Sequence, residues 1–521
     1  MKKIDYIILF ILSLLIILIP FVFFIYFATP DDPRYIYLLC GSYTGTPCSE
    51  VVFMGSIFGS FTAFLYSIND SIEWFGIQYY IYSLFAFAAI SWNCLDNNLN
   101  KLSKYSLLSL TFLIHVYLTF TPQSTMLSTE LGFASFLMML NANKSMWKYT
   151  VSIILFFIGI QMRFDGVFIP YMIGCPLFLK NLSFKNFSWI KDKIYLVILL
   201  VVAGVCLFAN KSSYESEDWT RFKSYNNARG FLADNPFLAD FEDSINDEED
   251  LLAYRLFYKY RIFDQNILTQ KKIDNYKEHF SDSVYSIINK NLSSYISGYK
   301  ENGGFLVFLI LLVGVFVLIK NKNWQSVILI SLITILFAIA NLYMMTTGPM
   351  KERVILFTYI TFIFSTSALC LKNRIFQVGS ILLFTIYFGY SYFKKDYTIA
   401  CDSRIERKLV CETEKMLSTC KDDKVLLPVP TELTPELFST SKSIIGKKGI
   451  IQGWMHIYPK ADLSYQPFTS LVDGIPVLIR KNSMEQITII QRLIQLHYHI
   501  DSTIKLCDES ENYFLLKLVS K

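Results

Sequence analysis

Residues 50–66, EVVFMGSIFGSFTAFLY, form an apolar run whose interpretation fixes the orientation of every later helix in the chain. If this run crosses the bilayer, each following helix is inverted relative to a chain in which it stays on one side. The positions of Lys and Arg distinguish the two arrangements, because short cytoplasmic loops are enriched in both residues. The apolar runs and basic loops on either side of residues 50–66 therefore determine its place.

The composition is that of a membrane protein. Of the 521 residues, 53% are apolar and 17% are charged, and the mean hydropathy is +0.38. Soluble globular chains of this length are less apolar, and the net charge of +5 reflects loop residues and predicts no nucleic-acid partner. A bilayer core of ~30 Å needs about 20 apolar residues per helix, and somewhat shorter spans are tolerated. We predict about eleven spans, near residues 6–27, 77–95, 105–121, 125–141, 149–164, 166–180, 194–210, 304–320, 325–346, 353–371 and 375–393.

The basic residues favour a cytoplasmic N-terminus and no span at residues 50–66. In this arrangement most Lys and Arg residues near helix ends lie in cytoplasmic loops, whereas a twelfth span would place most of them outside. We therefore expect residues 50–66 to form a helix at or dipping into the outer interface. Gly55, Gly59 and Ala63 recur at every fourth position of this run and allow close packing on other helices. The N-terminal run has no small-residue cleavage site, so we expect a retained first helix.

This topology divides the chain into a multi-span membrane module, residues 1–393, and an exoplasmic C-terminal domain, residues 394–521. The membrane module has a first outer loop at 28–76 and a large polar outer loop at 211–303. We expect the large loop to be mostly helical. Its acidic run at 247–250 is interpreted as a solvated helix start rather than a metal site, because blocks of charge are usually solvated.

The C-terminal domain combines strand and helix patterns. Residues 482–500 have the apolar spacing of an amphipathic helix, with Ser483 and Gln486 spaced as a capping box. The fold class that we predict is therefore an all-α polytopic membrane protein with a C-terminal α/β or α+β domain. Three short apolar runs predict strands: KVLLPVP (424–430), GIPVLIRK (474–481) and YFLLKLV (513–519).

Two adjacent acids, Asp31 and Asp32 in FATPDDPRY (27–35), follow the first helix directly. One interpretation is a helix-end turn, because TPDDP has turn chemistry. The other is a catalytic site, because ionisable groups at the membrane edge are costly and indicate function. Basic residues in the other outer loops favour the second interpretation. Together with the acids they suggest a catalytic general base and a group of cations that binds a phosphate, which we call the phosphate clamp. Basic residues that the topology places in short outer loops are Arg34, Arg163, Lys351 and Arg353.

With its PDDPRY motif and its layout, the chain resembles the GT-C class of membrane glycosyltransferases, which use polyprenyl-phosphate-linked sugars. In size and layout it is similar to the serotype-converting O-antigen glucosyltransferases. The resemblance implies an inverting hexosyltransferase of the bacterial inner membrane, which moves a sugar such as glucose to a cell-surface glycan such as O-antigen on the periplasmic face. Its partners would be the lipid-linked sugar, the glycan acceptor and membrane lipid.

The resemblance also assigns roles to residues. Asp31 or Asp32 matches the acidic position and would act as general base, which contributes ~10²- to 10⁴-fold to such a reaction. The basic residues have no strict family motif; by topology they would stabilise the charge on the leaving lipid phosphate. A divalent Mg²⁺ or Mn²⁺ ion on the second aspartate stays an open alternative, because two adjacent acids do not make a full site.

Aromatic residues outside the predicted spans are candidates for sugar contacts. Trp219, Tyr225 and Trp454 each combine an apolar face with a polar group that suits stacking on sugar rings. Ordinary packing is the alternative for each of them. The segment IIQGWMHIYP (450–459) has the Gly, Trp, His and Pro of a shaped loop rather than a strand.

Six of the ten cysteines fall in regions assigned outside, which fits disulfides in an oxidising compartment such as the bacterial periplasm. Cys40 and Cys48 are close in sequence, so we predict that they form a disulfide that closes the loop after the acids. Unpaired thiols are the alternative, because pairing cannot be read from a sequence.

Two other functions remain open at this stage. An O-antigen or capsule polymerase is also a multi-span enzyme with a large periplasmic loop, but it would transfer a whole lipid-linked glycan. A transporter of lipid-linked glycans belongs to a different class, in which internal repeats and midplane ionisable groups are common. The sequence shows neither feature clearly, and charged residues cluster at the outer helix ends instead.

Overall fold

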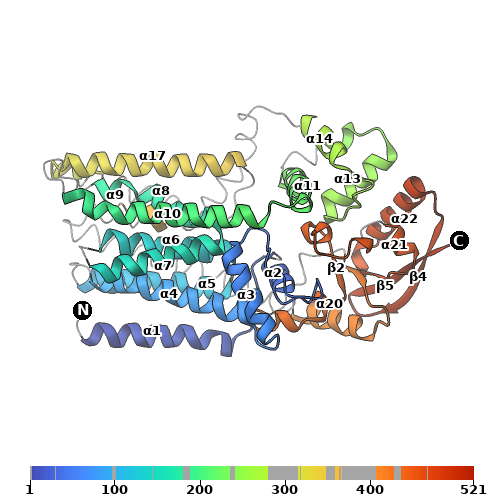
Figure 1. Cartoon of the computed structure of the whole chain (residues 1–521), viewed down its shortest axis with the longest axis horizontal. Helices are drawn as coiled ribbons and strands as arrows, with labels where there is room; N and C mark the ends of the chain where they lie inside the picture. The colour runs from blue at the N-terminus through green and yellow to red at the C-terminus, as the bar shows by residue number, and fades with distance from the viewer. Residues whose placement is uncertain are drawn as a thin grey trace.

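The structure, a computed structural model, has a long helical bundle at one end and a smaller domain with a β-sheet at the other (Figure 1). We call the end of the bundle that meets this domain the domain end. The structure describes residues 3–29, 31–96, 101–142, 145–179, 188–234, 241–279, 312, 315–316, 318–347, 358, 360–362, 365, 407–427, 436–465 and 468–521.

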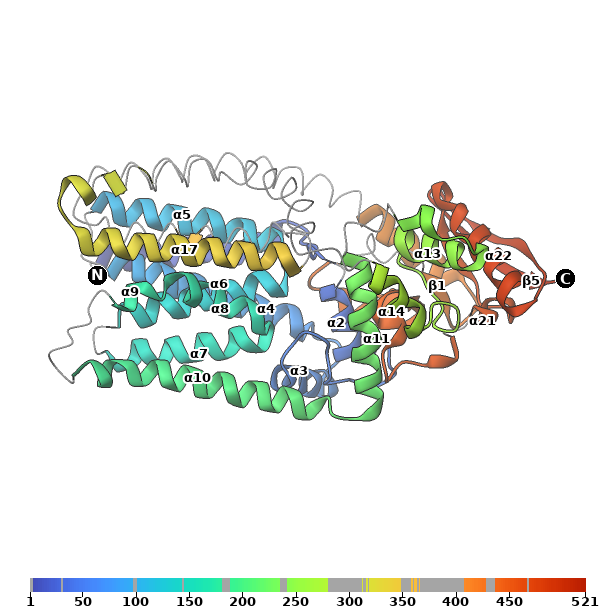
Figure 2. The ribbon, with the colours of Figure 1, turned by 90° about the horizontal axis from the view of Figure 1, so that it is seen from above.

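The bundle helices run side by side, and both views show them sharing one long axis (Figures 1 and 2). Helix α6 lies at the centre and packs on α4, α7 and α8. Large apolar side chains are exposed on α1, α10 and α17, which surround this centre. The helices are α1 (Lys3–Val22), α4 (Trp74–Asp96), α5 (Lys101–Phe120), α6 (Ser124–Leu140), α7 (Met146–Met162), α8 (Phe164–Gly174), α9 (Pro176–Leu179), α10 (Ser188–Ser213) and α17 (Trp324–Thr347).

Three described helices are long and apolar enough to cross a membrane: Lys3–Val22, Ile194–Ser213 and Trp324–Tyr343. These make the chain a membrane protein and confirm the coarse fold prediction. The count is smaller than the eleven spans predicted from the sequence. Helices α6, α7 and α8 are each 17 residues or shorter, and most of the predicted span at 304–320 lies outside the described residues. The predicted spans at 353–371 and 375–393 lie almost wholly outside the described residues.

The run at residues 50–66 forms helix α3 (Ser56–Ile68), which lies across the bundle axis at the domain end (Figures 1 and 2). Its small residues permit close packing, as the spacing predicts. A Cβ atom on Gly59 would come within 2.0 Å of the carbonyl oxygen of Ser49, and one on Gly55 within 2.1 Å of the side chain of Gln161. Helix α3 therefore closes the domain end of the bundle rather than adding another parallel helix.

The C-terminal domain is built on a mixed five-stranded sheet in the order β2-β1-β3-β5-β4. Strand β1 is parallel to β2 and β3, whereas β5 is antiparallel to β3 and β4. Helix α22 (Glu485–Tyr498) packs its apolar side on the sheet, so that Ile490 and Leu493 join Ile479 and Leu516 in one core. The strands are β1 (Val425–Leu427), β2 (Gly449–Ile451), β3 (Val477–Arg480), β4 (Ser502–Glu509) and β5 (Tyr513–Ser520). Short helices in this domain are η2 (Thr440–Lys442), α20 (Ile444–Lys448), η3 (Trp454–Ile457), η4 (Leu463–Tyr465), α21 (Thr469–Val472) and η5 (Lys481–Ser483).

The sequence predicted β1, β3, β5 and α22, and the structure confirms all four. The predicted capping box at the start of α22 is wrong. Ser483 lies in the preceding turn of 3₁₀ helix, and the residue before α22 is Met484, which provides no side-chain cap. A capping box needs an extended backbone at the Ser position, whereas here the chain is already helical before α22 begins.

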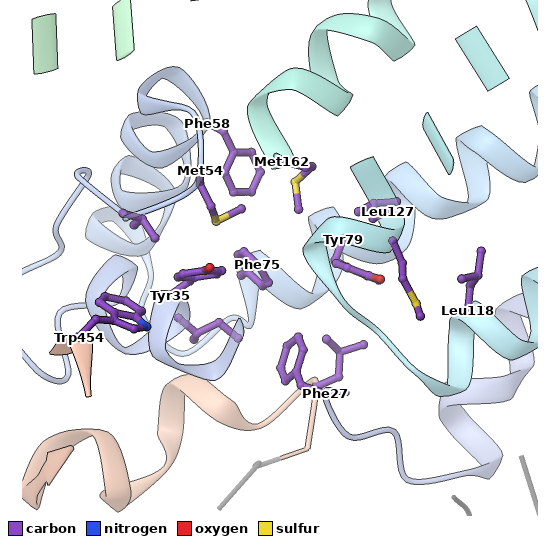
Figure 3. Packing of buried hydrophobic residues seen from close by; sticks show 14 of the residues in the cluster. Phe27, Tyr35, Met54, Phe58, Phe75, Tyr79, Leu118, Leu127, Met162 and Trp454 are labelled. Atoms are coloured by element: carbon purple, nitrogen blue, oxygen red, sulfur yellow. The ribbon is translucent and has the colours of Figure 1, made fainter. Parts of the chain in front are cut away.

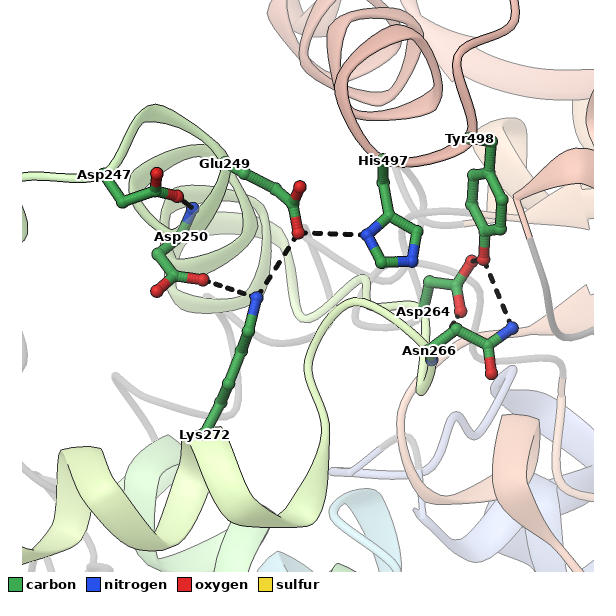
Figure 4. Close-up of polar contacts among 8 residues, drawn as sticks. All are labelled: Asp247, Glu249, Asp250, Asp264, Asn266, Lys272, His497 and Tyr498. Atoms are coloured by element: carbon green, nitrogen blue, oxygen red, sulfur yellow. Dashed lines mark hydrogen bonds and ion pairs between the residues drawn. The ribbon is translucent and has the colours of Figure 1, made fainter.

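Between the bundle and the sheet lies a helical segment of α11 (Glu217–Asp234), η1 (Glu242–Ser244), α13 (Glu248–Tyr260) and α14 (Gln270–His279). The acidic run is a helix start, as predicted: the Asp247 carboxylate accepts a hydrogen bond from the Asp250 backbone N–H at 2.9 Å and caps α13. Glu249 pairs with His497 of α22 at 3.0 Å and with Lys272 of α14 at 3.3 Å (Figure 4). The run thus joins the large loop to the C-terminal domain.

The bundle and the C-terminal domain are connected directly at the end of α1. Tyr26 forms an antiparallel bridge with Glu436, and the Leu437 backbone N–H donates to the carbonyl of Ile25 at 2.8 Å. The buried carboxylate of Glu73, just before α4, accepts hydrogen bonds from the N–H and hydroxyl of Ser441 at 2.8 and 2.6 Å. Burial raises the pKa of Glu73, which these hydrogen bonds partly offset.

Candidate functional site

The acid pair opens helix α2 (Asp31–Leu39) at the domain end. Two acids in the first turn interact favourably with the positive end of a helix dipole. Pro33, in the same turn, is tolerated because no carbonyl in the preceding turn needs its missing N–H. Asp31, Asp32 and Pro33 together therefore explain why a new helix starts at residue 31.

Asp32 is buried, with 1% of its surface exposed. Its Oδ1 accepts hydrogen bonds from the hydroxyl of Ser124 and, at 3.0 Å, from the Ser124 backbone N–H. Its Oδ2 accepts from the Thr29 hydroxyl at 2.8 Å. Burial raises the pKa of Asp32 to about 6, although these hydrogen bonds favour the charged form. Asp32 therefore ties the first loop to the start of α6.

Asp31 differs from its neighbour in exposure, with 35% of its side chain accessible. Its Oδ1 accepts hydrogen bonds from Arg34 Nη1 at 3.3 Å and from the indole N–H of Trp454 at 3.0 Å. Trp454 also lies beside Tyr35, with ring centroids 5.9 Å apart (Figure 3). One carboxylate of the pair is thus held by the C-terminal domain and reaches solvent.

Trp454 reaches Asp31 because of the backbone of the preceding residue. Gly453 has φ +91°, a left-handed conformation that favours glycine. A Cβ atom at this position would also lie 3.5 Å from the guanidinium of Arg34. The prediction of a shaped loop rather than a strand in IIQGWMHIYP is correct only in part, because Ile450 and Ile451 belong to strand β2. The turn at Gly453 then places Trp454, which is buried, against Asp31.

Arg34 is almost fully buried, with 7% of its surface exposed. Besides Asp31, it donates from Nη2 to the carbonyl oxygen of Gln452 at 3.3 Å, and its Nε has no hydrogen-bond partner among the described residues. Burial lowers the pKa of Arg34, and the carboxylate of Asp31 offsets part of this effect. A buried guanidinium with an unused donor is costly.

A further arginine, Arg229 of α11, was not predicted from the sequence. Arg229 is half-buried and donates from Nε and Nη2 to the side-chain oxygen of Asn226 at 3.2 and 2.7 Å. The pKa of Arg229 falls to about 10, mainly through burial and further through the nearby guanidinium of Arg34. The sequence gave no sign of it, because Arg229 belongs to a polar helix and is 195 residues from Arg34 in the numbering.

Arg163 lies at the junction of α7 and α8, on the bundle side of the acid pair. Its guanidinium is 5.2 Å from the ring of Phe53, and its carbonyl accepts a hydrogen bond from Ser128 at 2.5 Å. Burial raises the pKa of Tyr35, and the charge of Arg163 lowers it slightly. Lys351 and Arg353, the other predicted clamp residues, lie outside the described residues.

The other two residues predicted to contact sugar, Trp219 and Tyr225, are buried and pack against other side chains. Trp219 is 4% exposed, and its ring lies edge-on to Tyr214 and to Tyr458, with centroids 4.8 and 5.3 Å away. Tyr225 is 7% exposed and donates its hydroxyl to the carbonyl of Leu268 at 2.7 Å. Both residues fill the contact between α11 and its neighbours, so the structure favours the alternative interpretation for them.

The predicted disulfide between Cys40 and Cys48 is absent, because both residues are free thiols in the structure. The two sulfur atoms have different partners. Cys48 Sγ lies 2.7 Å from the hydroxyl of Tyr458, whereas Cys40 Sγ lies 3.8 Å from the carbonyl of Tyr37. The loop between them contains Gly41 at φ +77° and is closed by backbone hydrogen bonds, including Cys48 N–H to the carbonyl of Leu38 at 2.9 Å.

A polar triad lies inside the bundle beneath the acid pair, and the sequence analysis missed it. His115 Nδ1 is 2.7 Å from Glu130 Oε1, and the hydroxyl of Ser83 donates to Glu130 Oε2 at 3.2 Å. All three side chains are buried. A single His in α5 and a single Glu in α6 carry no motif, yet their presence within apolar runs is the signal that could have found them.

No group of three or more His, Cys, Asp or Glu side chains is arranged for a metal ion within the described ranges. Of the acid pair, Asp32 uses both oxygens for hydrogen bonds and is buried, whereas Asp31 has 35% of its side chain accessible. Comparisons with models of protein families, with curated proteins and with solved structures find no match to this chain.

Proposed function

We propose that this chain is a membrane glycosyltransferase that moves a sugar from a polyprenyl-phosphate donor to a cell-surface glycan. The observation that supports this most is the division of the acid pair at the domain end of an apolar bundle. Asp32 is buried and fixes the loop, whereas Asp31 is partly exposed beside Arg34 and Trp454. A fixed loop and an accessible carboxylate are what a general base at the membrane edge requires.

In the proposed reaction, Asp31 takes the proton of the acceptor hydroxyl while the acceptor oxygen attacks the anomeric carbon. The bond between this carbon and the phosphate oxygen breaks, the configuration inverts, and the electron pair leaves with the lipid phosphate. Arg163 is on the bundle side and would stabilise the growing phosphate charge. Lys351 and Arg353 keep the same proposed role. Asp32 would act as a positioning residue, because it holds the start of α2 on α6.

The surroundings of the acids are consistent with a lipid-linked donor. The exposed apolar side chains of α1, α10 and α17 would provide a lipid-facing surface. Tyr35, Phe75 and Met54 belong to one buried apolar cluster, in which Tyr35 lies beside Trp454 (Figure 3). A polyprenyl tail would remain in the apolar layer while its phosphate reaches Arg163. We further propose a GT-C-like fold of about eleven spans in the bacterial inner membrane, with Asp31 facing the periplasm.

The decisive experiment is sugar transfer by the purified full chain in proteoliposomes, with radiolabelled polyprenyl-phosphate sugar and a glycan acceptor. Asp31→Asn keeps the shape of the side chain but removes its basicity, so turnover should fall by ~10² or more. Asp70→Asn, which changes an exposed acid just before α4, is the matched control and should retain wild-type turnover. Wild-type rates in Asp31→Asn would overturn the proposed function.

One observation favours a second candidate, a transporter of lipid-linked glycans. The buried pair of His115 and Glu130 lies within apolar helices, where ionisable groups often mark transport pathways. The same proteoliposomes separate the two functions. Movement of the labelled lipid between leaflets without any transfer of its sugar would favour the transporter, whereas labelled glycan would favour the transferase. A ladder of products rather than one added sugar would indicate a polymerase.

A further inference from the structure

Three consecutive residues of the C-terminal domain reach the turn that carries the acid pair. The carbonyl oxygen of Gln452 accepts a hydrogen bond from Arg34 Nη2 at 3.3 Å, and a Cβ atom on Gly453 would lie 3.5 Å from the same guanidinium. The indole N–H of Trp454 donates to Asp31 Oδ1 at 3.0 Å. This segment therefore contacts Asp31 directly and also holds the arginine that pairs with it.

The carboxylate of Asp31 receives two donors from different parts of the chain on one oxygen atom. Arg34 Nη1, from the same helix α2, lies 3.3 Å from Oδ1, and the indole of Trp454 reaches the same atom from the C-terminal domain. Hydrogen bonds to a charged acceptor are about twice as strong as bonds between neutral groups. Two such bonds on one oxygen restrict the rotation of the carboxylate, so its second oxygen has a defined direction.

Trp454 is itself firmly held. It is 3% exposed, and its ring lies 5.9 Å from the ring of Tyr35, measured between centroids, and 6.0 Å from the guanidinium of Arg34 (Figure 3). The side-chain oxygen of the buried Gln452 accepts a long hydrogen bond, 3.5 Å, from the backbone N–H of Phe263, which follows α13. A donor whose own position is fixed by packing and by hydrogen bonds holds its acceptor precisely in place.

A general base needs this restraint. In the proposed reaction, a carboxylate oxygen of Asp31 must come within about 2.6–3.2 Å of the acceptor hydroxyl. With 35% of its side chain accessible, Asp31 is not fixed by burial, so its hydrogen bonds must set its direction. The enclosed ring of Trp454 presents no open face for stacking on a sugar. Trp454 therefore acts on the base rather than on the substrate.

We propose that Trp454 is a positioning residue for Asp31, so that the C-terminal domain supplies part of the centre for sugar transfer. This inference rests on the proposed function for the role of Asp31 as base, whereas the hold of the indole on the carboxylate does not. The N–H of Trp454 fixes the direction of the carboxylate and favours its charged form. An indole with only a structural role would leave the protonation of Asp31 unchanged.

The first test is steady-state kinetics of the full chain in proteoliposomes with Trp454→Phe, which keeps an aromatic ring beside Tyr35 but has no N–H. The acid limb of the kcat/KM profile should move about one pH unit higher, because the carboxylate loses a hydrogen bond that favours its charge. The kcat should fall about ten-fold or more as the base loses its fixed direction, while the KM for the lipid-linked donor stays within about two-fold of wild type.

The matched control is Trp74→Phe, which removes an indole hydrogen bond of 2.8 Å to the carbonyl of Asn69, outside this centre. The control should keep the wild-type pH profile. A wild-type profile in Trp454→Phe would overturn the positioning role. A higher KM for the acceptor with an unchanged profile would overturn it as well, and would make Trp454 a sugar contact.

The second test needs no sugar transfer. A water-soluble carbodiimide with an amine modifies carboxyl groups in their protonated form, and mass spectrometry follows the product at Asp31 as the pH changes. In Trp454→Phe the pH of half-maximal modification should be about one unit higher than in wild type, because the carboxylate holds its proton more tightly. The exposed Asp70 should keep its value in both chains. Equal values for Asp31 in both chains would contradict the proposal.

Replacing Trp454 with benzothienylalanine by nonsense suppression covers the case in which Trp454→Phe does not fold. Sulfur then replaces the indole N–H in a ring of nearly the same shape, and the chain should show the same two shifts. An unshifted half-maximal pH at Asp31 in this chain would overturn the proposal. If the wild type transfers no sugar, the proposed function fails, whereas a shifted carbodiimide reaction would still establish the hold of Trp454 on Asp31.

Discussion

At the residue scale, the acid pair shows how one turn of helix gives two identical side chains different environments. Successive residues of an α-helix point about 100° apart, so Asp32 faces α6 and its Ser124 while Asp31 faces Trp454 of the C-terminal domain. Burial then gives the two carboxylates different properties, because it raises the pKa of Asp32 and leaves Asp31 partly exposed. The acid that is enclosed loses access to substrate and gains a structural role, while its neighbour remains accessible.

The raised pKa of Asp32 predicts a pH dependence of stability. In the folded chain this pKa is about 6 against an ordinary value of 3.8, so the folded state binds the proton more tightly than the unfolded state does. The stability that protonated Asp32 contributes is complete below about pH 4 and is lost as pH rises through 6. The loss amounts to about 3 kcal/mol at most, since one pKa unit corresponds to about 1.4 kcal/mol.

Asp32→Asn should remove this dependence, because an amide keeps an oxygen for Ser124 but does not titrate in this range. We expect the thermal unfolding temperature of the variant, relative to wild type, to rise between pH 4 and pH 7 in the same detergent. The measurement is differential scanning fluorimetry at both pH values. Parallel curves for wild type and variant would show that Asp32 is not buried as described.

The identity of the acids could be predicted from sequence at this scale, but not the division of roles between them. Asp31 and Asp32 stand out because charge directly after an apolar run is costly. Which of them is enclosed depends on Ser124, and which one reaches Trp454 depends on a residue 423 positions away. Arg229 has no local signal at all, because its significance comes from elements that meet only in the folded chain.

At the element scale, α6 organises the bundle because every residue from Ser124 to Met139 is buried. Such a helix needs small residues where neighbouring backbones approach. Gly132 is one of them, since a Cβ atom there would lie 2.6 Å from the carbonyl oxygen of Val167 in α8. The Cβ atom would be attached directly to the backbone of α6, and the carbonyl oxygen belongs to the backbone of α8. The clash could therefore be relieved only by shifting one of the two helices.

Gly132→Ala should therefore destabilise the chain, by about 1–3 kcal/mol as for other overpacked cores. The matched control is Gly204→Ala in α10, where an added Cβ meets no atom within 4 Å. Because Ala favours helix over Gly by up to about 1 kcal/mol, the control should be neutral or slightly stabilising. Thermal unfolding of both variants in detergent provides the comparison, and equal stability of the two would argue against the α6–α8 contact.

Sequence patterns found most elements of this fold but missed those without a clear apolar face. Strand β5 is mainly apolar and buries Tyr513, Leu515, Leu516 and Leu518, and the sequence predicts it, whereas β4 is exposed from Thr503 to Glu509 and was not predicted. The first helix was expected to run to residue 27 but ends at Val22. Residues Ile25 and Tyr26 leave the helix to pair with the C-terminal domain, a contact that no local hydropathy pattern can indicate.

At the scale of the whole molecule, the large loop and the C-terminal domain form one continuous structure. Arg492 of α22 pairs with Glu248 of α13 at 2.9 Å. His497 of α22 pairs with the next residue, Glu249 (Figure 4). These contacts require the segment that begins with α11 and the domain that ends at β5 to lie on the same side of the membrane. They restrict the topologies that the basic loops alone left open.

Alkaline phosphatase fused at residue 250 and at the C-terminus should therefore give the same result at both positions. From the positions of Lys and Arg we expect both fusions to be active, which places them outside the cytoplasm. The matched control is a fusion between the predicted spans 77–95 and 105–121, in the segment that contains Lys101. This segment is predicted to be cytoplasmic, so the control fusion should be inactive. Opposite results at residue 250 and at the C-terminus would contradict the packing of α13 on α22.

The hydrogen bond between Trp454 and Asp31 also sets the order in which a newly made chain can mature. At about 5–20 residues per second, translation of the 423 intervening positions takes at least roughly 20 seconds. During that interval the first loop is already at the membrane, but Asp31 has no indole to hold it and Arg34 has no Gln452 carbonyl. We expect a nascent or prematurely terminated chain to insert its early helices and still lack the contacts that hold Asp31 and Arg34, so that the ribosome must complete nearly the whole protein before this site is assembled.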